Sequence, residues 1–294
     1  MTSRTCPNCG HDQSKEILET KDYSTSHESF VIIQCVQCHL KRTDPLPSID
    51  ELPKYYQSSN YISHIEKPRN IIDYTYQQAR KYTLRWKTNI LRQFNSENSI
   101  LDYGCGTGEF LNYCQSIGYT VAGYEPTSSA AEIASKKLPH KIYQDQNKIQ
   151  GQYPIITLWH VLEHVYGLKQ TLLYLQTKLT KSGTMFIAVP NHNSADSIKY
   201  GKYWAGYDVP RHLWHFDRLT MEAIMAQHQF RIQQIIPMKL DAYYISLVSE
   251  QYKTSRQHAN LSNMINAIVS GWTSNAKAKK TGEYSSLIYV IQHA

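Results

Sequence analysis

The chain has 294 residues, of which 41% are hydrophobic and 19% charged, with a formal net charge of +7. This length is sufficient for one large domain and a small additional module. The sequence has no run of 18 apolar residues, and "MTSRTCPNCG" at its start lacks a signal-peptide core. We therefore expect a cytoplasmic protein without a membrane span.

Residues 1–45 contain two C-x-x-C pairs, Cys6 with Cys9 and Cys35 with Cys38. In a chain without an export signal, four cysteines at this spacing favour a tetrahedral zinc site over disulfides. Four thiolates leave no open position for a substrate, so we expect a structural zinc in a ribbon-like module. The alternative is that the two pairs are reduced thiols without a metal.

Charge argues against nucleic acid as the partner of this module. Residues 1–50 carry five Lys or Arg against seven Asp or Glu. A nucleic-acid groove would concentrate basic charge on one module, whereas here the excess is spread over the rest of the chain.

Residues 46–69 are expected to be a linker, because "DPLPSIDELP" is punctuated by prolines. Helical spacing of apolar residues follows over about 70–94, and from residue 99 onward short apolar runs alternate with helical segments. This alternation predicts an α/β fold with a doubly wound, mostly parallel sheet. Its last two strands, in "RIQQIIPMKL" and "SSLIYVIQ", are expected to form an antiparallel hairpin at the edge. The helical insertion between them, at about 241–280, could be a lid or a partner surface.

The stretch "LDYGCGTGEF" places Gly104, Gly106 and Gly108 directly after a strand and before a helix. Glycines in this position let a backbone turn approach a cofactor. The dinucleotide fingerprint needs a third glycine at position 109, where this chain has a glutamate, and the P-loop motif is absent. S-adenosylmethionine fits better, because it carries a sulfonium and an amino group.

Acidic residues near this turn support the same cofactor. Glu125 ends the next strand, where a carboxylate can accept hydrogen bonds from ribose hydroxyls. Asp145, after the expected third strand, would border the adenine. Asp102 would brace the turn or meet the methionine amino group, and Cys105 lies within the turn.

With these motifs, the sequence resembles the class I S-adenosylmethionine-dependent methyltransferases over residues 70–294. "ILDYGCGTGEF" and "GYEP" match their first two motifs, and "LWHVLEHV" and "DVPRHLWHF" are similar to segments of the ubiquinone-type and sugar methyltransferase subgroup. The resemblance implies a seven-stranded Rossmann-like sheet and places His160 beside the cofactor. The fourth strand of such proteins usually opens with Phe-Asp, whereas here Tyr153-Pro154 stands in that place. A four-cysteine module before the domain also resembles certain sugar C-methyltransferases.

The acceptor is expected to lie near the two histidine-containing segments. His212 and His215 are the candidates for a general base, since imidazole titrates near neutral pH. Arg211 could hold an anionic group of the substrate or could pair with Asp208. The other candidate substrate contacts are two residues after the fourth strand and three aromatic side chains: Glu163, His164, Trp204, Tyr207 and Tyr243. A metal held by His160 and His164 is disfavoured, because the H-E-x-x-H order is absent.

The sequence therefore predicts an enzyme that transfers a methyl group from S-adenosylmethionine to a small-molecule acceptor by in-line displacement, with a histidine as base. The acceptor could be a phenolic, sugar or lipid-type oxygen or carbon. Two alternatives stay open: RNA or protein presented by the zinc module, and a cofactor-binding scaffold without catalysis. The oligomeric state is also left open.

Overall fold

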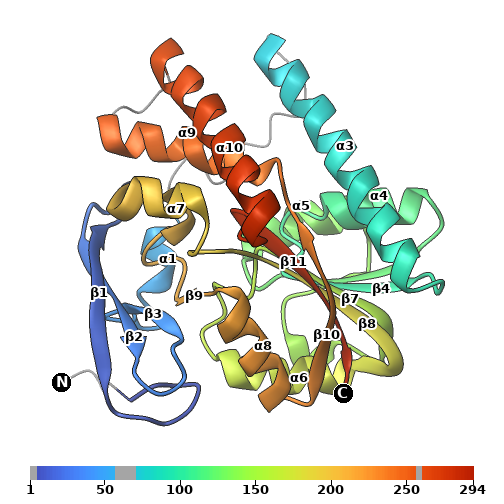
Figure 1. The fold of residues 1–294 in the computed structure, drawn as a ribbon. Helices are drawn as coiled ribbons and strands as arrows, with labels where there is room; N and C mark the ends of the chain where they lie inside the picture. The colour runs from blue at the N-terminus through green and yellow to red at the C-terminus, as the bar shows by residue number, and fades with distance from the viewer. Residues whose placement is uncertain (1–4, 57–70, 256–259) are drawn as a thin grey trace.

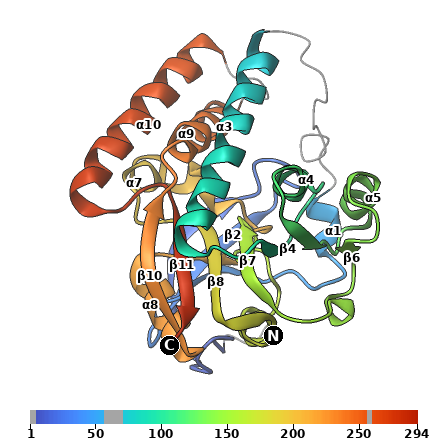
Figure 2. The same ribbon diagram turned by 90° about the vertical axis from the view of Figure 1, so that its right-hand side faces the viewer.

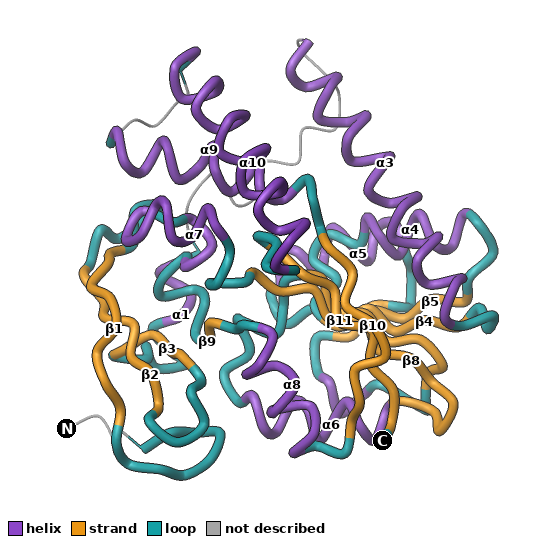
Figure 3. The backbone as a smooth tube through the Cα atoms, in the orientation of Figure 1, coloured by secondary structure: helices purple, strands orange, loops and turns teal. Residues whose placement is uncertain are grey.

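A computed structural model describes residues 5–56, 71–255 and 260–294, so most of the predicted linker at 46–69 lies outside the described residues. The described chain forms a seven-stranded sheet and a smaller four-stranded sheet (Figure 1). The tube drawing in Figure 3 shows the two sheets side by side, with helices between and above them.

The seven-stranded sheet has the order β10-β11-β8-β7-β4-β5-β6. Strands β4 to β8 pair in parallel, and β11 joins β8 and β10 antiparallel. The predicted α/β fold and the final hairpin are therefore confirmed. The strand bounds are β4 (Ser99–Tyr103), β5 (Thr120–Tyr124), β6 (Ile142–Tyr143), β7 (Tyr153–Trp159), β8 (Leu179–Pro190), β10 (Phe230–Pro237) and β11 (Ser286–His293).

Helices cover both faces of this sheet. Successive residues of a strand point to opposite faces, so neighbouring residues pack against different helices. Ile100 packs against helices α3 (Ile71–Phe94) and α4 (Glu109–Ser116). Its neighbour Leu101 belongs to the core built on α6 (Leu168–Lys178) and α8 (Arg218–Gln227). A strand that is buried on both faces has apolar residues at successive positions, as β4 does at Ile100 and Leu101.

The four-stranded sheet joins the N-terminal module to the larger domain. It has the order β1-β2-β3-β9, with β1 (Ser14–Lys21), β2 (Ser29–Cys35) and β3 (Lys41–Asp44) from the N-terminal module. The fourth strand, β9 (Trp214–His215), comes from the segment after β8, and it pairs with Lys41 and Arg42. Leu40 is 2% exposed and lies in the same core as Trp214. The module is thus packed into the larger domain.

The remaining elements surround this junction. The short helix α1 (Leu52–Tyr55) follows the module, and α7 (Ala195–Tyr200) with the 3-10 turns η2 (Gly201–Tyr203) and η3 (Ala205–Tyr207) follows β8. The insertion consists of α9 (Asp241–Thr254) and α10 (Leu261–Thr281), and α5 (Ser128–Lys137) and η1 (Gln146–Lys148) complete the described elements. Seen from the side, α9, α10 and α3 rise above one edge of the sheet (Figure 2). Among the described helices, none combines the length and the apolar character that crossing a bilayer requires.

Candidate active site

The glycine turn lies where β4 ends and α4 begins. Gly104 has a φ of +82°, and a Cβ there would lie 2.5 Å from Cγ2 of Val161, so a side chain is sterically excluded. At Gly106 the φ is +54°, and a Cβ would meet no atom within 4 Å. The backbone at Gly106 is therefore open, as close approach to a ligand requires.

Glu125 fixes the shape of this turn. Its Oε2 accepts a hydrogen bond from the Gly106 N–H at 2.9 Å, and its Oε1 accepts one from the Thr127 N–H at 2.9 Å. Each carboxylate oxygen keeps a further lone pair. The side chain is 8% exposed. Its two bonds to the turn leave lone pairs that could accept hydrogen bonds from ribose hydroxyls.

Asp102 lies within β4, directly before the turn. It is 3% exposed and accepts a hydrogen bond from Thr157 Oγ1 at 2.6 Å. Burial raises its pKa to about 7, against the opposing effects of Thr157 and Lys87. A cationic group placed beside it would favour the carboxylate form, which suits the amino group of methionine.

Lys87 and Trp159 are two residues near this end of the sheet that the sequence did not single out. Lys87 Nζ, on α3, lies 4.2 Å from the centre of the Trp159 ring. Burial lowers the pKa of Lys87 to about 8. The Trp159 Nε1 is buried and has no hydrogen-bond partner among the described residues. In the sequence, nothing distinguishes Lys87 from the other basic residues of a solvated helix.

His160 connects the end of β7 to the helical insertion. Its Nε2 lies 3.0 Å from Asp241 Oδ2, and its Nδ1 lies 3.3 Å from Glu163 Oε1. Burial lowers its pKa, but Asp241 and Glu163 outweigh burial and raise it to about 9. His160 is thus a cation at neutral pH.

Glu163, His164 and His212 come together where the sequence predicts contacts to the acceptor. Glu163 is 1% exposed, and within the described chain neither of its carboxylate oxygens accepts a well-formed hydrogen bond. Burial would raise its pKa, but His160 and the other histidines lower it overall. One ligand atom from each of the three residues lies within 4.8 Å of the others, which is also a donor set for a divalent metal.

His212 has one ring nitrogen held by the backbone and the other near carboxylates. Its Nδ1 lies 2.9 Å from the Gly206 carbonyl oxygen, so Nδ1 carries the hydrogen and Nε2 the lone pair in the neutral ring. The Nε2 lies 4.0 Å from Glu163 Oε1 and 4.0 Å from Asp208 Oδ2. This arrangement can accept a proton and stabilise the resulting imidazolium.

The ring of His164 is held by the backbone of Arg211 and by the hydroxyl of Tyr56. Its Nδ1 lies 2.9 Å from the Arg211 carbonyl oxygen and 3.1 Å from the Tyr56 hydroxyl. Burial, followed by the nearby His212, lowers the pKa of His164 to about 4. His164 is therefore neutral at physiological pH.

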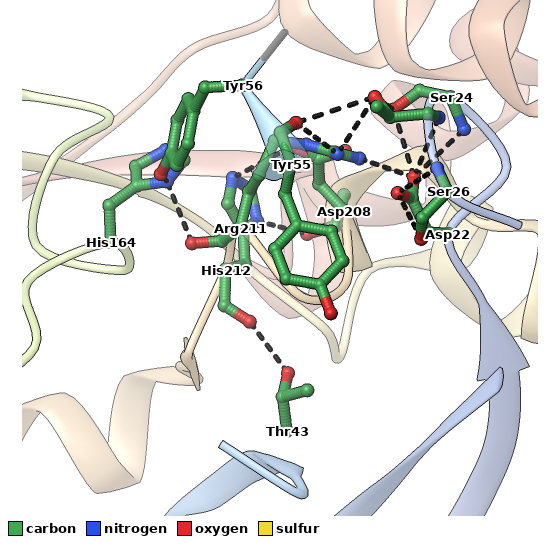
Figure 4. A network of polar contacts seen from close by, with 12 residues as sticks. Asp22, Ser24, Ser26, Thr43, Tyr55, Tyr56, His164, Asp208, Arg211 and His212 are labelled. Carbon is green, nitrogen blue, oxygen red and sulfur yellow. Dashed lines mark hydrogen bonds and ion pairs between the residues drawn. The ribbon is translucent and has the colours of Figure 1, made fainter. Parts of the chain in front are cut away.

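Arg211 is 3% exposed and binds two carboxylates (Figure 4). It donates to Asp208 through Nε and Nη2, at 2.9 and 2.6 Å, and its Nη2 also donates to Asp22 at 2.9 Å. Its Nη1 donates to the Tyr55 carbonyl at 3.0 Å and to Thr25 Oγ1 at 3.4 Å. The pairing with Asp208, one of the two roles considered from the sequence, is thus present, and the guanidinium is turned toward protein acceptors.

His215 lies at the junction of the two sheets. It is 4% exposed, and its Nε2 lies 3.0 Å from Thr43 Oγ1. Burial, with smaller contributions from His212 and His192, lowers its pKa well below the usual value. Thr43 Oγ1 also donates to the His212 carbonyl at 2.7 Å, so the module holds both histidine positions.

The comparisons with known proteins decide the family. A model of the methyltransferase domain family matches residues 74–235, which is more than half of the chain. The chain belongs to the methyltransferase family. The prediction of a class I S-adenosylmethionine-dependent methyltransferase is thereby confirmed at the level of the family.

An uncharacterised methyltransferase of Oceanobacillus iheyensis is 38% identical over 64 residues. That match spans 22% of this chain and 29% of the relative's length. Among solved structures, the StiE O-methyltransferase fragment has a TM-score of 0.50 at 14% identity, with 76% of this chain and 78% of that chain covered. Geranyl diphosphate C-methyltransferase from Streptomyces coelicolor has a TM-score of 0.49 at 11% identity, with 74% and 80% covered. At 14% identity, the likeness to the StiE fragment concerns the fold alone.

In this methyltransferase the predicted aromatic residues lie in two places. Trp204 and Tyr207 lie close to the histidines: Trp204 lines a narrow recess with His212 and His215, and the rings of Tyr207 and His215 are 5.4 Å apart. Tyr243 instead packs between α9 and α10, against Gly271. Asp145 is exposed and caps η1 by accepting from the Asn147 N–H at 2.9 Å.

The four cysteines of the methyltransferase meet in one cluster. Cys6 Sγ and Cys38 Sγ are 3.6 Å apart, as are Cys9 Sγ and Cys35 Sγ. All four sulfur atoms lie within 4.8 Å of one another. Zinc–sulfur bonds of about 2.3 Å would require sulfur–sulfur separations of about 3.8 Å, so the cluster fits a tetrahedral zinc ion.

Proposed function

We propose that the protein methylates an oxygen or carbon atom of a small-molecule acceptor, with His212 as the general base. The observation that carries this proposal is the orientation of His212, whose Nδ1 is held by the Gly206 carbonyl and whose Nε2 lies 4.0 Å from two carboxylates. His215 is the weaker candidate, because its Nε2 is engaged by Thr43.

The residues at the carboxyl ends of β4 and β5 would hold S-adenosylmethionine. The open backbone at Gly106, the spare lone pairs of Glu125 and the buried carboxyl of Asp102 suit its nucleoside and its amino group. When bound, this cofactor supplies an electrophilic methyl group that an acceptor takes up in one displacement. Asp145, from its place after the third strand, and His160, as the family resemblance implies, would complete its surroundings.

His212 would accept the acceptor's proton at Nε2. Glu163 and Asp208 would then stabilise the imidazolium, since neither carboxylate is more than 4.0 Å from that nitrogen. General-base catalysis of this kind contributes about 10²–10⁴-fold to the rate. His164 and Glu163 would border the acceptor itself.

A small acceptor is favoured by the shape and charge of this region. His212 is 9% exposed, and Trp204, Trp214 and Phe216 pack beside it, so a bulky polymer would have little access to its imidazole. The charge of residues 1–50, with five Lys or Arg against seven Asp or Glu, also disfavours binding of phosphates. Both features argue against RNA as the substrate.

The proposal includes a structural zinc on Cys6, Cys9, Cys35 and Cys38, in a module over residues 1–45 that precedes a methyltransferase domain over 70–294. Reduced thiolates of this kind persist in a reducing compartment, so we place the protein in the cytoplasm.

The test begins with S-adenosylhomocysteine in a calorimetric titration. Binding is expected, and its absence would end the proposal. Isotope-labelled S-adenosylmethionine would then be incubated with panels of phenols, sugars, lipid intermediates, RNA and protein extracts. Label in a small molecule supports the proposal, whereas label in RNA or protein supports the alternative. Cofactor binding without transfer to any class indicates a scaffold.

A further inference from the structure

Helix α10 presents its large apolar side chains to solvent. The residues that it buries are small or polar: Asn263, Ala267, Ser270, Gly271, Ser274 and Ala278. Its exposed large apolar side chains form what we name the α10 stripe, with the exposed fraction of each in parentheses: Leu261 (74%), Met264 (42%), Ile265 (53%), Ile268 (59%), Val269 (55%) and Trp272 (65%).

This distribution is the reverse of that in an ordinary surface helix, which turns its apolar stripe toward the core. The small residues of the buried face allow α10 to approach α9 closely. At Gly271, for example, a Cβ would lie 2.7 Å from Cδ1 of Tyr243. The packing on α9 thus explains the buried face, but no described contact of the chain explains the stripe.

The stripe is continuous and large. Its residues recur at intervals of three and four, so they share one side of the helix. Together they expose roughly 600 Å² of apolar surface, at the upper end of what monomers tolerate in a single patch. A standard interface takes about 800 Å² from each partner, so the stripe with its polar surroundings has the size that a stable dimer needs.

The lack of charge along the α10 stripe favours a second copy of this chain as the partner. Residues 261–276 contain no Asp, Glu, Lys or Arg, and Lys277, Lys279 and Lys280 follow only after the stripe. A stripe without charge can meet its own copy across a two-fold axis without repulsion. A helix that binds a membrane surface would instead carry basic residues on its polar face, and here the polar face is packed against α9.

We propose that the α10 stripe is the interface of a homodimer, in which α10 packs against α10 of a second copy of this chain. Figures 1 and 2 show α9 and α10 projecting from the body of the molecule, where a second copy has access. This dimer does not depend on the identity of the methyl acceptor.

Analytical ultracentrifugation of the full chain tests the proposal, at concentrations from about 1 to 50 μM. A 34.0 kDa chain should sediment as a dimer of twice that mass at the upper concentrations. The double substitution Ile268→Asp and Trp272→Asp should raise the dissociation constant at least 100-fold. Asn266→Asp adds a charge to the same helix outside the stripe, and it should leave the dimer intact.

Thermal unfolding monitored by circular dichroism checks that the double variant is folded, as expected for residues that are exposed in the monomer. A wild-type chain that stays monomeric at 50 μM would overturn the proposal. So would a dimer that the double variant retains, because the interface would then lie elsewhere. Sedimentation of the wild type with phosphatidylglycerol vesicles, abolished by the double substitution, would assign the stripe to a membrane instead.

Discussion

The proposed cofactor site and the proposed acceptor site are built in different ways. The cofactor turn takes its residues from neighbouring segments, so that Asp102, Gly106 and Glu125 lie within 24 positions of one another. Where we propose that the acceptor binds, Asp22 and His164 come from distant parts of the chain, and both contact Arg211 once the module has packed. Substitutions in the module should therefore lower methyl transfer to the acceptor and leave the affinity for the cofactor unchanged.

The largest effect is expected from His212→Gln. Loss of the proposed base should lower kcat by about 10²–10⁴-fold, because His212 Nε2 is the atom that we propose receives the proton. The affinity for S-adenosylhomocysteine, measured by calorimetry, should stay the same. His140→Gln removes an exposed histidine and is the control; full activity in His212→Gln would shift the assignment to His215.

Removal of the zinc should be the next largest effect. Elemental analysis is expected to find one zinc per chain, and a strong chelator should lower transfer to the acceptor by about 100-fold as β3 and β9 separate. Binding of S-adenosylhomocysteine should persist. If chelation abolished methyl transfer and S-adenosylhomocysteine binding together, the cofactor site and the acceptor site would not be independent.

On the cofactor side, Glu125→Gln is expected to weaken S-adenosylhomocysteine binding by about 10–100-fold. A charge-assisted hydrogen bond contributes about 1.5–3 kcal/mol, and the amide would also serve the Gly106 N–H less well. Calorimetry measures the loss, with the exposed Glu132→Gln as control. An unchanged affinity would remove Glu125 from the cofactor site.

Asp22→Asn tests the link between module and acceptor segment more finely. Arg211 would keep Asp208 but lose an ionised partner, so kcat/KM for the acceptor should fall about 10-fold with no change in cofactor affinity. Glu28→Gln removes a carboxylate from the same module that binds Lys54 and Tyr55, and it should have little effect. Equal losses in the two variants would mean that the module acts only through its overall stability.

The smallest effect concerns pH. Burial opposes ionisation of Asp22, but Arg211 and backbone N–H groups outweigh it and lower its pKa from 3.8 to about 2. A lowered pKa gives stability that is present above the unfolded value and lost as the pH falls toward the folded value. The difference in unfolding free energy between wild type and Asp22→Asn should thus narrow by about 1 kcal/mol from pH 5 to pH 3. Urea unfolding at the two pH values measures it, and a gap that widens on acidification would contradict the assignment.

The sheet and the glycine turn could be predicted from the sequence. Alternating strand-like and helical segments determine the sheet, and the local spacing of the glycines determines the turn. The sequence also placed the four cysteines, whose two knuckles are short-range features. It could not predict that β9 would join the module's sheet, since a two-residue strand has no periodicity.

Residues that act through long-range contacts were equally hidden. Asp22 and Thr43 resemble ordinary loop and strand residues until Arg211 and His212 are brought beside them. Lys87 is one of several basic residues on α3, and only the fold places it over Trp159. The sequence predicted helical structure at α10. It could not predict that the large apolar side chains would face solvent, because that depends on how α10 packs against α9.

The pairing of β3 with β9 has a consequence for how this protein could have arisen and changed. A module joined by a flexible tether can be exchanged between genes, because its partner domain is complete without it. Here, a chain that began at residue 71 would lack the neighbour of Trp214 and half of the ionic partners of Arg211. The N-terminal segment and the segment around residue 211 are therefore constrained to evolve as one unit.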